Sequence, residues 1–347
     1  MRQWQGYRNG INLGGWLSQC DICDRKHLDS FIQEADIRQI AKTGFDHVRI
    51  PIDYRLFETE DGNPKEDGFR YLDRLLEWCN SYGLHMLIDV RETYGYTYDP
   101  EKREVERMRF FYSAEMQHRF QRLWMRVAGR YAQYFGTVAF ELLDEVVPEE
   151  VSDAWNETVR DVLTVIRQVA PRSWVVIGGV RYSCVKTVAL LDVPFDEHIV
   201  YSFHCFEPFA FTHQKAYWFG RMPFDYQMGY PDSIERYREK SSVFPYEVAG
   251  MIYDPFGGNM GPHYFEQLFQ TAVRNADADH VPLYCGAYGV IDRAPSEDAL
   301  RWFRDISDVF ERYRIGRALW NYKGKDFGLV SGALSEAGDE LAEILGK

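Results

Sequence analysis

The chain has 347 residues, 46% apolar and 27% charged, so it is long enough to bury one large core. Its formal charge of −13 argues against nucleic acid as a partner, because phosphate binding depends on clustered Lys and Arg. No stretch approaches the ~18 consecutive apolar residues of a membrane helix, and Met1 to Gln5 lack the apolar run of a secretory signal. We therefore expect a globular cytoplasmic protein with no membrane partner.

Short apolar runs alternate along the chain with segments whose apolar residues have helical spacing. In chain order, strands are predicted at 11–13, 47–50, 85–90, 138–142, 174–177, 199–203, 282–285 and 317–320. Helical patterns follow, as over 31–41, 72–79 and 155–166, and the first two are closed by Gly44 and Gly83. Alternation of this kind is typical of βα units that build a parallel sheet. An eightfold count predicts a single (β/α)8 barrel domain over residues 1–347.

One long region, 206–260, interrupts the regular alternation. It is irregular and rich in aromatic residues, namely Phe209, Phe211, Tyr217, Trp218, Phe219, Phe224, Tyr226, Tyr230 and Phe256. We expect a large loop insertion here, over the rim of the barrel at the carboxyl ends of the strands, where such barrels bind substrate.

The six cysteines are spread over the chain, and only Cys20 and Cys23 have the spacing of a metal or redox pair. A second Cys-x-x-Cys or a histidine pair is absent from the sequence, so we expect free thiols, buried or half-buried, and no zinc. Glycines at 14–15 and 178–179 are too sparse for a phosphate-binding loop, so no cofactor is expected.

Polar residues gather within or just past the predicted strands, toward the carboxyl ends, where a barrel presents them to a substrate. They are Arg49, Asp89, Arg91, Glu92, Asp144, Glu145, His204, Glu207, Trp320 and Asn321. Each has an ordinary structural interpretation by itself: Glu145 as a helix cap, His204 as a hydrogen-bonded residue at a strand end, and Trp320 as core. Their collection at one face of the barrel favours a functional site.

Several motifs occur in a specific order along the whole chain. They are Gly10-Ile-Asn-Leu-Gly-Gly-Trp-Leu17, Asp46-His-Val-Arg-Ile-Pro51, Phe140-Glu-Leu-Leu143 before Glu145, Phe203-His204 running into Glu207-Pro-Phe209 and Phe211-Thr-His-Gln214, Gly286 with Gly289, and Trp320 with Phe327-Gly328. In this order the chain resembles the family 5 glycoside hydrolases, and among them the cellulase-like β-glucan enzymes.

The resemblance implies a two-carboxylate mechanism in which one group protonates the leaving oxygen and the other attacks the anomeric carbon with retention. It places the acid/base at Glu145 and the nucleophile at position 287, in a motif usually written Gly-Glu-aromatic-Gly. Here that position is Ala287. The substrates implied are β-linked glucosides or oligosaccharides, with no metal or cofactor. The substrate-binding residues implied are Arg49, Arg91, Asp144, His204, Phe206, Tyr288 and Trp320.

Three further positions depart from the pattern of the family. Asp144 replaces the usual Asn before the acid/base, Arg91 replaces a His after the third strand, and Phe206 replaces a Tyr that normally hydrogen-bonds the nucleophile. Losing that hydroxyl together with the nucleophile leaves no unsatisfied partner, and Arg91 beside Asp144 is suited to a charge-assisted pair. We therefore interpret the pocket as remodelled as a whole.

Three functions remain open at this point. The chain is a family 5 glycosidase with retaining hydrolysis impaired or absent, or it is a glycan-binding pseudoenzyme, or Glu145 acts as a lone base or acid for other proton-transfer chemistry in a pocket made apolar by Phe206 and Ala287. An inverting glycosidase needs a second carboxylate about 6.5–9.5 Å from Glu145. Glu92 and Glu207 are the candidates for it.

Overall fold

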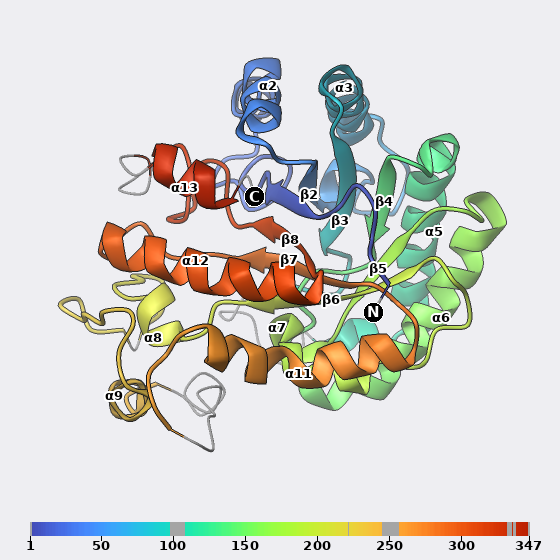
Figure 1. The fold of residues 1–347 in the computed structure, drawn as a ribbon. Helices are drawn as coiled ribbons and strands as arrows, with labels where there is room; N and C mark the ends of the chain where they lie inside the picture. Colours follow the sequence, from blue (N-terminus) through green and yellow to red (C-terminus); the bar gives the residue numbers. More distant parts are fainter. Residues whose placement is uncertain are drawn as a thin grey trace.

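The protein forms a closed parallel barrel of eight strands in sequential order, β1 to β8 (Figure 1). This computed structural model describes residues 2–97, 108–220, 222–244, 257–331, 335 and 338–345. The strands are β1 Asn9–Asn12, β2 His47–Asp53, β3 His85–Glu92, β4 Val138–Glu141, β5 Val175–Gly178, β6 Ile199–Cys205, β7 Leu283–Tyr288 and β8 Gly316–Leu319. All eight predicted strands, and the barrel that they form, are confirmed.

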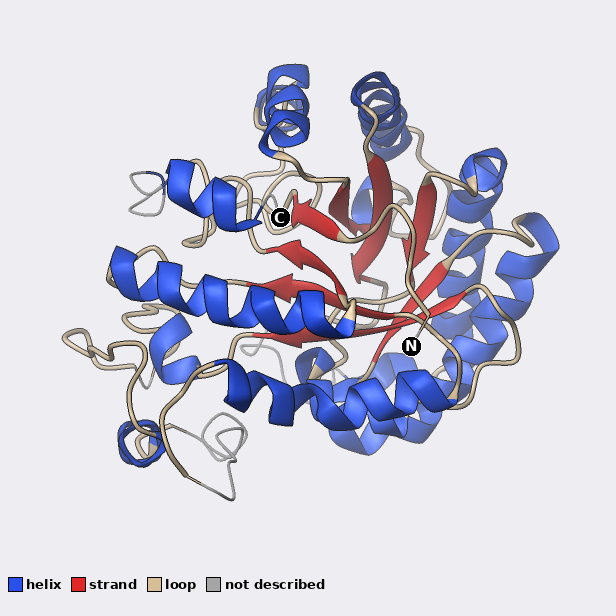
Figure 2. Cartoon of the chain, in the orientation of Figure 1, coloured by secondary structure: helices blue, strands red, loops and turns tan. Residues whose placement is uncertain are grey.

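Helices surround the strands, as Figure 2 shows in blue around red. They are α1 Arg25–Ser30, α2 Glu34–Thr43, α3 Asp67–Tyr82, α5 Ala114–Tyr131, α6 Ser152–Val169, α7 Val180–Ser183, α8 Phe209–Thr212, α9 Ile234–Ser241, α11 Pro262–Ala278, α12 Ser296–Tyr313 and α13 Gly338–Leu345. Short 3-10 turns lie at Tyr54–Leu56, Arg109–Tyr112, Ala132–Tyr134, Glu149–Val151 and Val185–Leu190. The predicted stops are confirmed: Gly44 and Gly83 end α2 and α3 in the left-handed conformation that glycine adopts without strain.

Two apolar cores hold the barrel. The larger lies between strands and helices, where the buried stripe of α12, including Trp302 and Phe310, packs against the outer face of the barrel. The smaller fills the barrel interior with Trp4, Tyr7, Leu87, Ala139, Val176, Val200, Tyr284 and Ala318. Trp4 stacks on Tyr7 with ring centroids 3.8 Å apart, so the N-terminal segment plugs the amino-terminal end of the strands.

The predicted insertion at 206–260 is only partly irregular. It contains α8 and α9, and α9 begins where the Ser233 side chain accepts a hydrogen bond from the Arg236 N–H. The pattern of α9 was missed because only two of its eight side chains are apolar, so no amphipathic stripe marks it. Among the aromatic residues, Tyr217, Trp218 and Phe224 are 76%, 46% and 96% exposed. Phe256 lies outside the described residues.

The cysteines divide into two groups. Cys79, Cys184, Cys205 and Cys285 are buried free thiols, as predicted. Cys20 and Cys23 form a disulfide, so the prediction of free thiols is wrong for this pair. Their Cα atoms lie 5.3 Å apart because the chain turns after β1, and that separation is within reach of a disulfide.

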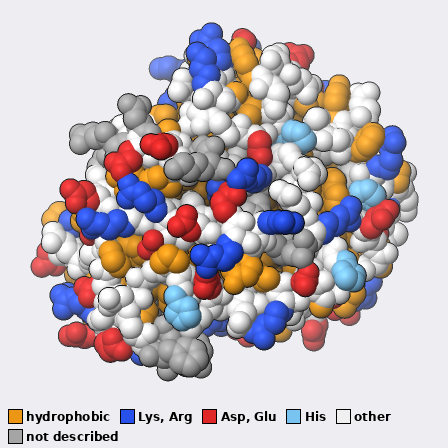
Figure 3. Space-filling model, viewed as in Figure 1, with side chains coloured by type: hydrophobic (Ala, Val, Ile, Leu, Met, Phe, Trp, Pro, Cys, Tyr) orange, Lys and Arg blue, Asp and Glu red, His pale blue; other side chains and the backbone are white. Residues whose placement is uncertain are grey.

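The surface over α12 carries interspersed acidic and basic side chains (Figure 3). On α12 itself, Arg301 pairs with Asp298 at 2.6 Å and with Glu297 at 3.2 Å. Exposed pairs of this kind contribute at most about 1 kcal/mol each. None of the described helices combines the length and the apolar sequence needed to cross a membrane.

Candidate active site

The side chains of the candidate site converge at the carboxyl ends of the strands. Arg49 lies in β2, Arg91 in β3, His204 in β6 and Ala287 in β7, while Asp144, Glu145 and Trp320 follow β4 and β8. In a parallel barrel these ends share one face, so residues far apart in the sequence meet there. The predicted gathering of these residues is therefore present in the structure.

Arg49 is the central cation of the site. Its guanidinium is fully buried and donates to Glu141 Oε2 at 2.6 Å, Asn12 Oδ1 at 2.9 Å and Asp144 Oδ1 at 2.9 Å. Asp89 lies 3.2 Å from the same guanidinium, and burial raises the pKa of Asp89 well above its usual value. Arg49 thus holds three carboxyl groups and one amide in place at the floor of the site.

Asp144 lies between two guanidinium groups. Burial by itself would raise the pKa of Asp144, but Arg91, Arg49 and His204 together outweigh burial and lower this pKa below its ordinary range. The ion pair between Arg91 Nη1 and Asp144 Oδ2, anticipated from the sequence, is present. Asp144 is therefore an ionised, fully engaged carboxylate.

Glu145 has a partner at each of its two carboxylate oxygens. Arg91 Nη2 lies 3.0 Å from Oε2, and His204 Nδ1 lies 3.2 Å from Oε1. Its backbone has a φ of 38°, which is strained for a residue with a side chain, and the Tyr96 hydroxyl donates to its carbonyl oxygen at 2.6 Å. Glu145 is thus held in place through both its carboxylate and its backbone carbonyl.

Arg91 also covers the aromatic face of the site. Its guanidinium carbon lies over the Trp320 ring, 5.6 Å from the centroid, and its side chain is only 7% exposed. Trp320 itself is 9% exposed and belongs to the edge of the larger core. The flat ring that would stack on a sugar is thus occupied by a cation of the protein.

Gly286, the neighbour of Ala287 in β7, lies across the His204 ring from Glu145. His204 is the register partner of Ala287 between β6 and β7, and a methyl group on Gly286 would lie 3.2 Å from His204 Nε2. Ala287 is 3% exposed. The position implied for a nucleophile therefore holds a buried alanine, in the strand that pairs with β6 beside His204.

Phe206 belongs to an apolar cluster beside the site. Its ring meets His213 edge-on at 5.2 Å and Phe327 at 5.8 Å. Burial lowers the pKa of His213 to about 3. The Phe206 ring thus packs among buried rings, and the His213 imidazole is already hydrogen-bonded to the Thr212 hydroxyl at 3.1 Å.

Tyr288 is not brought to the site. Its ring is fully buried and packs edge-on against Phe303 and Phe310, and against Trp302, on α12. The β7–β8 register shifts between Cys285 and Tyr288, and that irregularity changes which side chains of β7 face the barrel interior. Tyr288 supports the outer core, which does not fit the contact with substrate expected from the sequence.

One group of side chains in the described part of the chain has the spacing of a metal site, namely Glu141, Asp144 and His204, whose ligand atoms lie within 4.8 Å of one another. Arg49 donates to both Glu141 and Asp144, so the guanidinium already supplies the positive charge that their carboxylates need. We assign no metal here.

Sequence reasoning gave no role to Asn12, Glu141 and Tyr96, which all hold the site. Asn12 lies within the Gly-Ile-Asn-Leu-Gly motif, and Glu141 is an acidic residue in an apolar strand, which is costly unless paired. Those two signals were available in the sequence. No sequence signal pointed to Tyr96, because its hydrogen bond to the Glu145 carbonyl oxygen joins loops that follow different strands.

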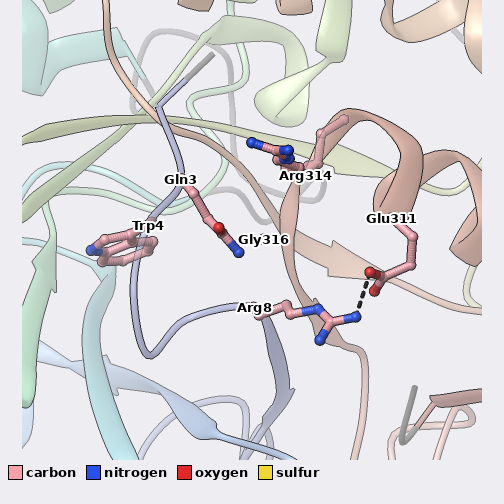
Figure 4. A pocket seen from close by; sticks show the side chains of 7 residues that line it. Gln3, Trp4, Arg8, Glu311, Arg314 and Gly316 are labelled. Atoms are coloured by element: carbon pink, nitrogen blue, oxygen red, sulfur yellow. Dashed lines mark hydrogen bonds and ion pairs between the residues drawn. The ribbon is translucent and has the colours of Figure 1, made fainter.

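A hollow of about 210 Å³ lies at the opposite end of the barrel and is lined by Gln3, Trp4, Arg8, Glu311, Arg314, Ile315 and Gly316 (Figure 4). Arg8 and Glu311 form an ion pair across it. It contains none of the predicted site residues. The amino-terminal face of a barrel of this kind generally serves stability rather than catalysis.

Comparison with known proteins agrees with this geometry. The family model described as Cellulase (glycosyl hydrolase family 5) matches residues 9–326. The chain belongs to glycosyl hydrolase family 5. Cellodextrinase A of Ruminococcus flavefaciens is 40% identical over 91% of this chain and 86% of its own length. Endoglucanase C of Acetivibrio thermocellus is 36% identical over 98% of both chains.

Solved structures of family members share the fold. Cel5A of Thermotoga maritima with cellobiose superposes with a TM-score of 0.73 at 23% identity, covering 98% of this chain and 97% of that one. A hyperthermophilic endo-beta-1,4-glucanase with substrate gives a TM-score of 0.74 at 22% identity, covering 99% and 97%. At 22–23% identity, this structural similarity shows that the chain shares the barrel fold of these proteins.

Proposed function

We propose that this family 5 protein binds β-linked gluco-oligosaccharides and does not hydrolyse them by the retaining mechanism. The observation that carries this proposal is the state of the two catalytic positions. Ala287 offers no nucleophile, and both oxygens of Glu145 are engaged, by Arg91 at 3.0 Å and His204 at 3.2 Å. A double displacement needs a free acid and an opposing nucleophile, and neither is supplied by this arrangement.

The contacts of the other candidate carboxylates do not favour an inverting mechanism either. Glu92 accepts a hydrogen bond from the Thr97 hydroxyl at 2.8 Å and pairs with Arg55 at 3.0 Å. Glu207 is buried beside the Cys205 thiol, and burial raises its pKa. Both groups belong to networks other than that of Glu145.

A binding role is supported by the aromatic rim of the barrel. Tyr217 and Trp218 are exposed on the insertion that follows β6, and Arg293 lies over the Tyr217 ring at 5.3 Å. Arg293 pairs in turn with Asp326, next to Phe327 of the Phe206 cluster. Exposed aromatic faces suit the apolar faces of sugar rings, and the relatives named cellodextrinase and endoglucanase suggest β-linked glucose as the sugar.

The interpretation of Glu145 as a lone base in an apolar pocket is not favoured by its contacts. A guanidinium and an imidazole lie against its two oxygens, so the immediate surroundings are polar. Glu145 thus lacks the apolar surroundings on which a lone base of this kind depends.

The test combines calorimetry with cello-oligosaccharides and hydrolysis of an aryl β-cellobioside. We expect the wild type to bind without measurable retaining turnover. A287E alone should stay inactive because Arg91 still holds Glu145, whereas the combined variant R91H/D144N/F206Y/A287E should gain hydrolysis. That gain should disappear when E145Q is added to the same background.

Three results would count against the proposal. Retaining hydrolysis by the wild type, or full activity of A287E by itself, contradicts the inactive state that we assign to Arg91 and Ala287. Absence of binding to every gluco-oligosaccharide at millimolar concentration contradicts the binding role.

A further inference from the structure

The site contains an internal cation in a setting built for one. The Arg91 guanidinium donates to Asp144 and to Glu145, and it lies over the face of Trp320. Two carboxylates and an indole face around one positive charge combine charge-assisted hydrogen bonds with a cation–π contact. An arrangement of this kind recognises a cationic group rather than a neutral hydroxyl.

We propose that the site at Asp144, Glu145 and Trp320 takes a sugar ring that bears a protonated amine, so that the preferred ligand is a β-linked amino-sugar oligosaccharide that displaces the Arg91 guanidinium. This inference rests on the proposed glycan-binding function and names the chemical class of the ligand. The ammonium group replaces the guanidinium between Asp144 and Glu145, and the ring lies on Trp320.

Charge balance decides between a cationic and a neutral ring. A ring can lie on Trp320 only when Arg91 moves away, because the guanidinium occupies that face. A neutral sugar then leaves two carboxylates with hydroxyl donors in place of a charged partner, and losing the charged partner of a buried pair is strongly unfavourable. An ammonium group restores both the charge and three N–H donors.

The remaining charged groups around the place that Arg91 occupies also favour a cationic ligand. Arg49 is the remaining guanidinium on Asp144, and it is shared with Glu141 and Asp89. His204 lies 3.2 Å from Glu145 and 3.4 Å from Asp144. With Arg91 displaced, the acidic groups outnumber these basic ones, so the vacated position attracts a cation.

Calorimetry with three matched tetrasaccharides tests the inference, at a pH below the pKa of the sugar amine. The probes are β-1,4-linked glucosamine tetramer, its N-acetylated form and cellotetraose. We expect the wild type to bind the amino tetramer about ten-fold tighter than either neutral tetramer, the gain from one added charge-assisted hydrogen bond.

Variants distinguish binding of the amino tetramer at this site from its general electrostatic attraction to an acidic protein. D144N should abolish the preference for the amino tetramer. If D144N folds poorly because Asp144 also pairs with Arg49, E145Q provides the same test at a carboxylate that pairs with Arg91. D161N removes the same charge from an exposed position on α6 and should leave the preference unchanged. R91M, which lacks the internal occupant, should bind the amino tetramer tighter than the wild type does.

Equal or tighter binding of cellotetraose by the wild type overturns the inference while leaving the proposed function intact. Persistence of the amino preference in both D144N and E145Q overturns it as well, as does an equal loss in D161N. If no tetramer binds to any variant, the proposed binding function fails, and this inference fails with it.

Discussion

At the scale of single residues, Arg49 is the side chain on which the charges of the site depend. It is fully buried and contacts Glu141, Asp144 and Asp89. Burying a guanidinium is costly, and the cost is offset only because each of its edges meets an oxygen. Removing it leaves several carboxyl groups buried without their cation.

We therefore expect Arg49→Met to lower the free energy of unfolding by about 3–5 kcal/mol, the usual effect of breaking a buried pair on one side. The matched control is Arg55→Met, whose side chain is 64% exposed and pairs with Asp53 and Glu92. An exposed pair should cost less than about 1 kcal/mol. Urea unfolding at neutral pH measures both, and similar losses in the two variants would contradict the role given to Arg49.

His213 links the Phe206 cluster to pH. Burial lowers its pKa to about 3, whereas an unfolded His titrates near 6.5. Between these two pKa values His213 is protonated in the unfolded state and neutral in the folded state. The stability that neutral His213 contributes is therefore fully present above pH ~6.5 and is lost progressively as the pH falls toward about 3.

His213→Phe keeps the ring and removes this proton site, so its stability should fall less than that of the wild type between pH 7 and pH 5. Thermal melts across that range provide the measurement. The exposed His263→Gln serves as the control and should follow the wild type. If the stability of the wild type and of His213→Phe changes with pH in the same way, the Phe206 cluster does not keep His213 neutral.

At the scale of elements, the site depends on how closely the ends of β7 and β8 approach. A Cβ atom on Gly289 would overlap the backbone carbonyl oxygen of Trp320. Only glycine allows the two segments to lie this close, and that contact positions Trp320 at the mouth of the barrel.

Gly289→Ala should displace the segment that carries Trp320, weaken oligosaccharide binding, and cost about 1–3 kcal/mol of stability, as overpacking does. Gly136→Ala is the matched control, because a Cβ there meets nothing within 4 Å. Calorimetry and urea unfolding on the pair test this. Undiminished binding in Gly289→Ala would mean that the position of Trp320 does not depend on the close approach.

At the scale of the whole molecule, the candidate site and the apolar plug formed by Trp4 lie at opposite ends of the barrel. The carboxyl end carries the charged site, while the amino end is closed by Trp4, stacked 3.8 Å from Tyr7 and edge-on to Tyr284 at 5.3 Å. Trp4 is only 3% exposed. The N-terminal segment is therefore part of the core.

Trp4→Ala should lower the free energy of unfolding by about 3–5 kcal/mol, as the loss of a buried aromatic side chain does. Because Trp4 is at the far end of the barrel, the dissociation constant for oligosaccharides should change by less than about two-fold. Tyr112→Ala, at a side chain that is 67% exposed, controls for loss of an aromatic group. A Trp4→Ala variant that folds stably but no longer binds would show that the two ends are coupled.

The sequence by itself determined the eight strands, the barrel and the strand ends at which Arg49, Arg91, Asp144, Glu145, His204 and Trp320 lie. The strands and helix ends follow from apolar periodicity and from Gly44 and Gly83 as helix stops, which depend on neighbours in the chain. The site positions follow from the order of motifs along the whole chain and the family resemblance that they carry. The pairing of Arg91 with Asp144 was also within its reach, because opposite charges follow adjacent strands.

Only the tertiary structure decided what these residues do to one another. That Arg91 lies on Trp320, that Glu141 binds Arg49 and that Trp4 closes the barrel are contacts between segments far apart in the sequence, and they depend on barrel closure. Tyr288 turned to the outer core at a register shift that periodicity cannot reveal. Local sequence patterns predict on which strand or loop a side chain lies, but the register and closure of the barrel decide which side chains contact one another.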